Sequence, residues 1–173
     1  MGSRNFLIEG GSGTGKTSVC EELARRAYHI VHGDRELAYQ GDPNTGAPVN
    51  VTGLSVHDHH IWRVDEVKAL IADHREATTF FCGGSRNFAK FVDLFDGVFV
   101  LEVDVETLAR RLDKRGKDEW GGRGRQAEQD LILRLHRTKE DVPRNGILID
   151  ATAPLTHVVD EILAKSRAAG SSA

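Results

Sequence analysis

A segment near the amino terminus has the residue types and the spacing that phosphate binding requires. It reads Gly10-Gly11-Ser12-Gly13-Thr14-Gly15-Lys16-Thr17, and Ser18 follows it. Glycines let the backbone curl so that successive N–H groups point at one phosphate, and a helix beginning near the lysine adds its positive dipole end. The lysine charge suits β- and γ-phosphates, and the threonine hydroxyl can hold Mg²⁺. We therefore expect residues 11–18 to bind nucleotide phosphates, with Lys16 catalytic and Thr17 a magnesium ligand.

The flanking residues place this segment between a strand and a helix. Phe6-Leu7-Ile8 is a short apolar run, and Val19, Cys20, Leu23 and Ala24 recur at helical spacing. The alternative is a glycine-rich turn with an incidental lysine, which does not account for this context. Strand, glycine loop and helix in this order indicate a phosphate-binding P-loop.

The rest of the chain alternates between strand-like and helical patterns. Further strands are predicted at residues 29–32, 78–82, 98–103 and 147–150, and helices at 17–27, 57–73, 87–95, 105–114, 128–140 and 156–166. Apolar strands separated by helices are typical of a parallel sheet covered on both faces. We predict an α/β three-layer sandwich in one domain, residues 1–167, followed by a flexible tail at 168–173.

Composition limits the classes of partner. The chain has 173 residues and a net charge of −3, so its overall charge favours neither nucleic acid nor an acidic membrane surface. It contains no apolar run long enough to span a membrane and no signal peptide. Cys20 and Cys82 lack metal-type spacing and fit free thiols in a reducing compartment. We expect a cytoplasmic enzyme, as a monomer or a homodimer.

Two segments interrupt the alternation of strands and helices. Residues 41–48 are rich in turn formers and lie in a long insertion at about 34–76, between the second and third strands. Residues 115–125 are basic and glycine-rich, and glycine-rich loops beside a phosphate site are typical of lids. We place a lid at about 115–126. A solvated basic loop is the alternative for its arginines.

With these segments in this order, the chain resembles the P-loop kinases of small molecules. This group contains nucleoside monophosphate kinases, shikimate and gluconate kinases and chloramphenicol phosphotransferase. The resemblance extends from the P-loop to the last helix, although only the P-loop is highly specific. It implies a five-stranded parallel sheet in the order 2-3-1-4-5, an acceptor-binding insertion after strand 2 and a lid after strand 4. It also implies ATP, or GTP, together with Mg²⁺.

The resemblance also assigns roles to single residues. Asp34 follows the second strand, where these kinases often place an aspartate that orients magnesium-bound water or the acceptor hydroxyl; a helix N-cap is the alternative. Arg86 resembles the arginine that grips an acceptor phosphate, and it could equally clamp a carboxylate; an arginine that opens a surface helix is the alternative. Cys82 stands where nucleotide kinases usually have an aspartate, so the carboxylate role falls to Asp34 alone.

Further contacts are predicted around these residues. Arg115 and Arg125 are expected to act on the phosphates, and Arg115 also on the donor base. The donor adenine is expected beside Thr152 and Pro154. The expected acceptor contacts are Asp34, Arg35, Tyr39, His60, Gly83, Gly84, Arg86, Arg123 and Arg137. Because His57 and His60 are three residues apart on a predicted helix, they share a face and suit either a metal ion or the acceptor.

These observations favour a phosphotransferase that moves the γ-phosphoryl group of ATP to a small acceptor. A nucleoside or nucleotide is the first choice of acceptor. The alternative is a metabolite or antibiotic hydroxyl, as for shikimate kinase or chloramphenicol phosphotransferase. A regulatory nucleotide-binding NTPase is the alternative from another class, although the chain lacks a guanine-reading Asn-Lys-x-Asp motif.

Overall fold

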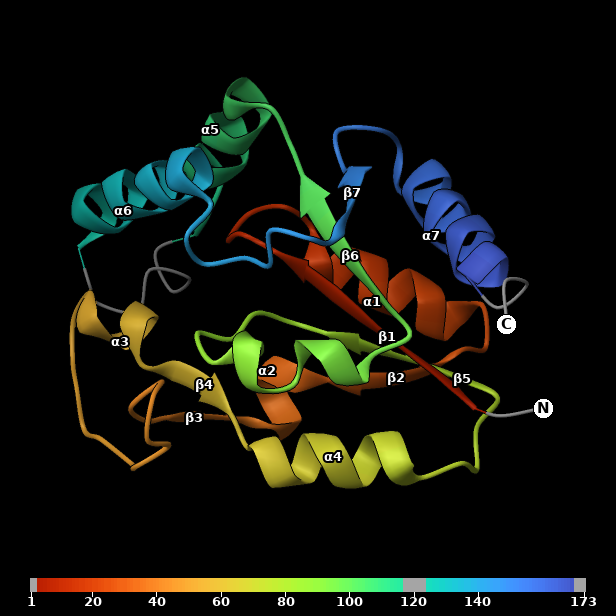
Figure 1. The fold of residues 1–173 in the computed structure, drawn as a ribbon. Helices are drawn as coiled ribbons and strands as arrows, with labels where there is room; N and C mark the ends of the chain where they lie inside the picture. The colour runs from red at the N-terminus through yellow and green to blue at the C-terminus, as the bar shows by residue number, and fades with distance from the viewer. Residues whose placement is uncertain (1–2, 117–123, 170–173) are drawn as a thin grey trace.

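A parallel five-stranded sheet forms the centre of the computed structural model, which describes residues 3–116 and 124–169 (Figure 1). The strands are β1 (Arg4–Gly10), β2 (His29–His32), β5 (Thr78–Cys82), β6 (Gly97–Glu102) and β7 (Ile147–Asp150). Their order is β2-β5-β1-β6-β7, and each pair of neighbours is parallel. Counted along the chain this is 2-3-1-4-5, so the predicted fold class and strand order are confirmed.

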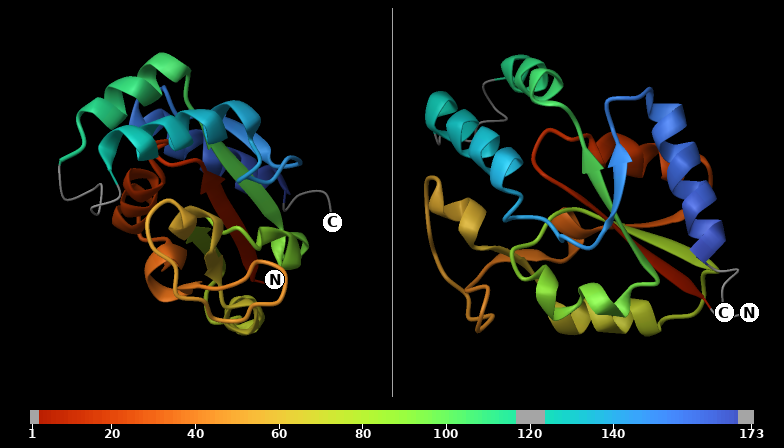
Figure 2. Two further views of the ribbon diagram at one scale, coloured as in Figure 1. Left: turned by 90° about the vertical axis from the view of Figure 1, so that its left-hand side faces the viewer. Right: turned by 45° about the horizontal axis from the view of Figure 1, so that its top comes forward.

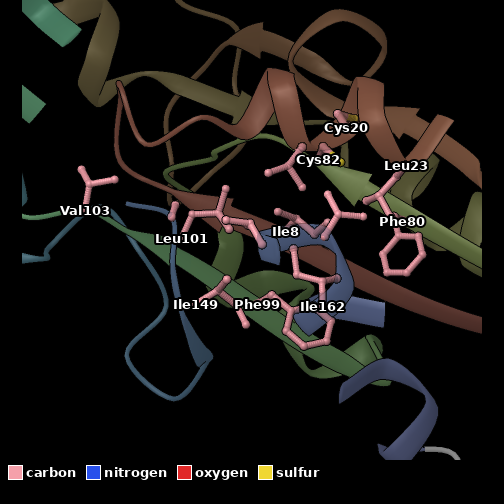
Figure 3. Packing of buried hydrophobic residues seen from close by; sticks show 14 of the residues in the cluster. Ile8, Cys20, Leu23, Phe80, Cys82, Phe99, Leu101, Val103, Ile149 and Ile162 are labelled. Atoms are coloured by element: carbon pink, nitrogen blue, oxygen red, sulfur yellow. The ribbon is translucent and has the colours of Figure 1, made fainter. Parts of the chain in front are cut away.

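Helices cover both faces of the sheet, because β1 is apolar on both sides. Phe6 and Ile8 pack in one buried cluster with α1 (Lys16–Arg25) and α7 (Leu155–Ala169), as the close-up in Figure 3 shows for part of it. Leu7 points the other way, into a second cluster that includes Val67 of α4 (Val64–Ala72). Successive side chains of a strand alternate between faces, so a continuous apolar run produces the three layers.

The insertion after β2 contains structure that the sequence patterns did not predict. It comprises α2 (Gly33–Glu36), β3 (Ala38–Gln40), α3 (Ser55–Asp58) and β4 (His60–Trp62). β3 and β4 pair antiparallel, with Tyr39 opposite Ile61. The single helix predicted over 57–73 is therefore wrong, because strand pairing interrupts it before α4 begins.

Trp62 explains why the chain prefers this strand. Its side chain is fully buried and stacks on Phe91 with ring centroids 5.6 Å apart and planes 2° apart. The helix predicted over 87–95, which would contain Phe91, is also replaced, by two short 3-10 turns, η1 (Phe88–Lys90) and η2 (Val92–Leu94). Large aromatic burial overrode a local helical pattern at both places.

The last two helices before β7 lie at the carboxyl ends of the strands, near the insertion (Figures 1 and 2). They are α5 (Val105–Asp113) and α6 (Arg125–Thr138), and both match predicted helices closely. Asp104 caps α5, since its Oδ1 accepts a hydrogen bond of 2.7 Å from the Thr107 amide. The centre of the predicted lid, residues 117–123, lies outside the described residues.

The carboxyl-terminal helix α7 continues to Ala169, so residues 168 and 169 of the predicted tail are helical. The remaining residues of that tail lie outside the described part of the chain. Among the described helices, none has both the length and the apolar composition that crossing a bilayer requires.

Candidate functional site

The P-loop connects β1 to α1 and adopts a conformation that requires glycine. Gly13 and Gly15 have φ angles of 84° and 99°, a region that residues with a β-carbon rarely adopt. The hydroxyl of Thr14 donates to the Gly11 carbonyl at 2.7 Å and braces the turn. The Lys16 ammonium folds back onto the same loop, donating to the carbonyls of Gly10 at 2.5 Å and Gly11 at 3.1 Å.

Two arginines from the end of α5 reach the P-loop. The Arg111 guanidinium donates to the Gly13 carbonyl and to the Ala151 carbonyl, both at 3.1 Å. Arg115 donates to the Ser12 hydroxyl at 2.8 Å. Arg115 was expected at this site from the sequence, whereas Arg111 was not. The four-residue spacing was the available signal, because in a continuous helix it places two side chains on one face. In the structure, Arg115 lies two residues beyond the end of α5.

These residues line a groove of about 570 Å³, here called the P-loop groove. Its wall consists of residues 12–19, Asp34, Arg111, Arg115, Ala151, Ala153, Leu155 and Val158. The predicted base contacts Thr152 and Pro154 are absent from this wall, although their neighbours Ala151 and Ala153 belong to it. The amide of Thr152 instead donates to the Asp150 carboxylate at 2.9 Å.

Asp34 lies just after β2 and is held by residues from distant segments. One oxygen accepts hydrogen bonds from the Gly84 amide at 3.2 Å and the Trp62 indole at 3.4 Å, and it lies 3.0 Å from Nε2 of His60. The carboxylate therefore joins the insertion to the loop after β5. The α2 helix has no side-chain cap, so the N-cap alternative does not describe Asp34.

The electrostatic surroundings keep Asp34 charged. Partial burial by itself raises the pKa of Asp34, but the hydrogen bond with His60 and the charge of Lys16 outweigh it. The pKa of this carboxyl consequently lies below its ordinary value. Its side chain is 45% exposed, so solvent and ligands can reach the charge.

Two glycines make room for this arrangement. A β-carbon on Gly33 would lie 2.0 Å from the Trp62 ring, and one on Gly83 would lie 2.6 Å from the Asp34 carboxylate. Both distances are shorter than any real contact, so Trp62 and Asp34 take their positions only because these residues are glycines.

Cys82 ends β5 beside this cluster but supplies no charge. It is 5% exposed, and Figure 3 shows it next to Cys20 of α1. Burial raises the pKa of the Cys82 thiol, and contact with Cys20 raises it further. The thiol stays neutral and cannot replace an aspartate. Both cysteines are free, as expected.

A second cavity, of about 300 Å³, lies between the P-loop, the insertion and α6; we call it the insertion cavity. Its wall includes His57, His60, Gly84 and Arg86 on one side and Ile132, Leu135 and His136 of α6 on the other. Ser12, Thr14, Lys16 and Asp34 line both the insertion cavity and the P-loop groove. The two cavities therefore meet at Lys16 and Asp34.

Two cations in the wall of the insertion cavity, Arg86 and Lys139, are each paired with a carboxylate. Arg86 donates to the Asp58 carboxylate at 2.6 Å and is 17% exposed. Lys139 lies 3.1 Å from the carboxylate of Glu102. Arg86 and Lys139 each have a carboxylate partner, whereas Lys16 in the same wall bonds loop carbonyls, so the cavity contains both signs of charge.

The two histidines of the insertion do not share a helix face, so that prediction is wrong. His57 lies in α3, and its Nε2 is 3.0 Å from the buried carboxylate of Glu128 in α6. His60 lies in β4 and contacts Asp34. Within the described residues, no group of three or more His, Cys, Asp and Glu side chains is placed to hold a metal ion.

The remaining predicted residues take other positions. Arg35 borders a small cleft with Cys82 and Gly83. Tyr39 donates to the Gly46 carbonyl at 2.7 Å, away from both cavities. Arg137 is exposed on α6, where neighbouring His136 faces the insertion cavity instead. Arg125 donates to the Asp113 carbonyl at 2.9 Å. Arg123 lies outside the described residues.

A family model described as an AAA domain matches residues 7–132, which include the P-loop and most of the sheet. The chain belongs to this family. A comparison of the chain with curated protein sequences found no match.

Several solved structures resemble nearly the whole chain. A gluconokinase from Sinorhizobium meliloti 1021 is 21% identical with a TM-score of 0.58, over 97% of this chain and 94% of that chain. A shikimate kinase from Bacteroides thetaiotaomicron is 14% identical with a TM-score of 0.57, over 94% and 97%. A deoxyadenosine kinase from M. mycoides is 17% identical with a TM-score of 0.51, over 94% and 98%. At these identities the likeness concerns the fold, and the expected small-molecule kinase fold is confirmed.

Proposed function

We propose that this protein transfers the γ-phosphoryl group of ATP to a hydroxyl group of a small acceptor. The observation that carries the proposal is the meeting of two cavities at Lys16 and Asp34. Phosphoryl transfer requires donor and acceptor in line, with positive charge at the transferred group. A nucleotide in the P-loop groove and an acceptor in the insertion cavity satisfy both requirements at this junction.

The chain's own residues divide the work between binding and orientation. The P-loop amides and Lys16 hold the donor phosphates, while Arg111 and Arg115 approach the same loop from α5. Asp34 accepts the hydrogen of the acceptor hydroxyl and aims its oxygen at the phosphorus. Because the transition state is loose, positioning matters more than the strength of the base.

The groove also offers suitable ligands for Mg²⁺. The hydroxyl of Thr17 and the carboxylate of Asp34 both line the P-loop groove, and magnesium prefers oxygen donors of these kinds. When bound, the ion neutralises charge on the donor phosphates. The depressed pKa of Asp34 keeps this carboxyl available as an anion.

The acceptor that best fits is a hydroxyl compound without a phosphate. Arg86 was expected to grip an acceptor phosphate, but its charge is balanced by Asp58. Lys139 is balanced in the same way by Glu102. The pairing of both cations favours a nucleoside acceptor over a nucleotide acceptor. It also makes sugar-like metabolites as good a candidate as nucleosides. The names of the gluconokinase, shikimate kinase and deoxyadenosine kinase agree with hydroxyl acceptors of this kind.

The experiment is ADP release with Mg-ATP, and in parallel GDP release with Mg-GTP, across an acceptor panel. The panel contains nucleosides, nucleoside monophosphates, sugars, sugar acids and hydroxyl-bearing antibiotics, and Lys16→Ala serves as the inactive control. We expect stimulation by a phosphate-free hydroxyl compound that is lost in Lys16→Ala. Stimulation by monophosphates alone would restore Arg86 as a phosphate clamp. Slow hydrolysis indifferent to every acceptor would instead support a regulatory NTPase.

A further inference from the structure

Glu9 is a buried carboxyl group for which the mechanism above has no use. It is the penultimate residue of β1, directly before the P-loop, and it is 1% exposed. Among the described residues, its two carboxyl oxygens are the only buried side-chain oxygen or nitrogen atoms without a hydrogen-bond partner. The Gly10 amide interacts with the carboxyl electrostatically but does not meet hydrogen-bond geometry.

A group in this state weakens the fold. Burial raises the pKa of Glu9 well above its ordinary value, although the nearby charge of Lys16 opposes the effect. The neutral acid still has an O–H donor and acceptor positions that nothing satisfies. Unmet buried hydrogen-bonding groups are rare in folded proteins and call for a specific explanation.

The position of the carboxyl supplies that explanation. A β-carbon on Gly84 would lie 3.5 Å from Oε2 of Glu9 and 4.0 Å from the Gly10 carbonyl, with no other atom within 4 Å. Gly84 and Gly10 both line the insertion cavity. The Glu9 carboxyl therefore lies directly behind the cavity wall, beside a residue that contributes only backbone to this wall.

Gly84 also connects Glu9 to the reaction centre. Its amide donates to Asp34, while its unfilled side-chain position faces Glu9. The two carboxyl groups thus flank one residue at the base of the insertion cavity. An acceptor with two neighbouring hydroxyl groups can place one at Asp34 and the other at Glu9.

We propose that Glu9 is a specificity-determining residue whose carboxylic acid hydrogen-bonds a second, non-reacting hydroxyl group of the acceptor beside Gly84. This inference rests on the proposed kinase function and narrows its acceptor to neutral polyhydroxy compounds, such as sugars and the ribose of nucleosides. A site built to bond a hydroxyl rejects analogues that lack it, because its buried polar group then stays unpaired.

The test compares the best acceptor of the panel with its deoxy analogue in wild type, Glu9→Gln and Glu9→Leu. Leu7→Val is the matched control, because Leu7 lies two residues earlier on the same face of β1 and away from both cavities. We expect wild type to favour the hydroxyl compound at least tenfold in kcat/KM. Glu9→Leu should raise the acceptor KM at least tenfold and abolish this preference, with the ATP KM within twofold. Glu9→Gln, which keeps some hydrogen-bonding capacity, should fall between them.

Thermal unfolding of the ligand-free proteins gives an independent readout. Removing an unmet buried polar group should raise the Tm of Glu9→Leu above that of wild type, whereas Leu7→Val should lower it. An unchanged preference for the hydroxyl compound in Glu9→Leu would overturn the inference. So would a fall in Tm accompanied by equal losses for ATP and acceptor, since Glu9 would then be structural.

Failure of the kinase proposal would be visible separately. If wild type phosphorylates no acceptor in the panel, the proposed function fails. The Tm values of ligand-free wild type and Glu9→Leu then test by themselves whether Glu9 is reserved for a ligand. A higher Tm for Glu9→Leu would then still support a group reserved for a ligand, and a lower Tm would overturn the inference.

Discussion

At the scale of single residues, the Asp34 carboxylate follows β2 and the Cys82 thiol ends the neighbouring strand β5, and only the carboxylate is charged. Asp34 is reached by the His60 ring, the Gly84 amide and the Lys16 charge, which together lower its pKa despite partial burial. Cys82 is buried against Cys20, which raises its pKa. In the proposed mechanism, acid–base work at this junction is therefore assigned to Asp34 rather than to Cys82.

Asp34→Asn should lower kcat by about 10²-fold or more, the range typical of general acid–base groups. The amide preserves size but cannot take the acceptor proton or ligate Mg²⁺ strongly. Steady-state kinetics with the preferred acceptor measure the effect, and Asp65→Asn, at an exposed position of α4, is the control. An unchanged kcat would show that Asp34 only joins the insertion to the sheet.

Arg111→Ala should raise the KM for ATP about tenfold or more, because Arg111 bonds the P-loop at Gly13 and the adjoining loop at Ala151. Arg110→Ala is a matched control on the same helix, since the Arg110 side chain is exposed and, within the described part of the chain, donates only to the Thr107 hydroxyl. Equal effects of the two substitutions on ATP would mean that general basic charge, rather than this contact, matters.

At the scale of elements, helix α1 carries the P-loop at one end and an ion-pair network at the other. Glu22 accepts hydrogen bonds of 2.7 and 2.8 Å from Arg25 and 2.8 Å from Arg26. Arg26 extends the network to Asp160 of α7 at 2.5 Å. The hydrogen bonds from Arg25 and then Arg26 lower the pKa of Glu22 to about 2.

This shift predicts how stability depends on pH. A carboxyl whose pKa is lower in the folded state stabilises the protein above its unfolded pKa of 4.5 and stops doing so as pH falls toward about 2. Glu22→Gln should therefore be less stable than wild type at pH 7, and the difference should shrink between pH 4.5 and 2. Urea unfolding at pH 7, 5, 4 and 3 measures it. Glu21→Gln, at an exposed neighbouring position, should show no such convergence; convergence there would indicate a general charge effect.

At the scale of the whole molecule, nucleotide binding at the end of the sheet should stabilise the entire fold. A ligand at 100 times its Kd adds about 2.7 kcal/mol, which corresponds to a Tm increase of roughly 5–10 °C for a chain of this length. Mg-ATP should produce this shift in wild type and little of it in Lys16→Ala. The ligand-free Tm values should be similar, because among the described residues the Lys16 ammonium bonds only the loop carbonyls of Gly10 and Gly11. A full shift in Lys16→Ala would contradict the P-loop assignment.

The sequence determined those features that follow from short-range patterns. The spacing of residues 10–17 specifies the P-loop, because phosphate contacts come from one continuous turn of backbone. The apolar runs specify five strands; β1 and β5 are buried along nearly their whole length, whereas β2 and β7 at the edges of the sheet are less buried. Strand order and most helices followed from these patterns and the family resemblance, and the structure confirmed them.

Only the tertiary structure decided which side chains meet. Trp62 was expected in a helix, but its burial against Phe91 makes it part of a strand. Arg86 meets Asp58 and Asp34 meets His60 across 28 and 26 residues of chain. Glu9 is a polar residue at the end of an apolar strand, and only the folded structure shows that its carboxyl is buried beside Gly84 without a hydrogen-bond partner. These contacts depend on packing between distant segments, so local propensity and residue spacing cannot predict them.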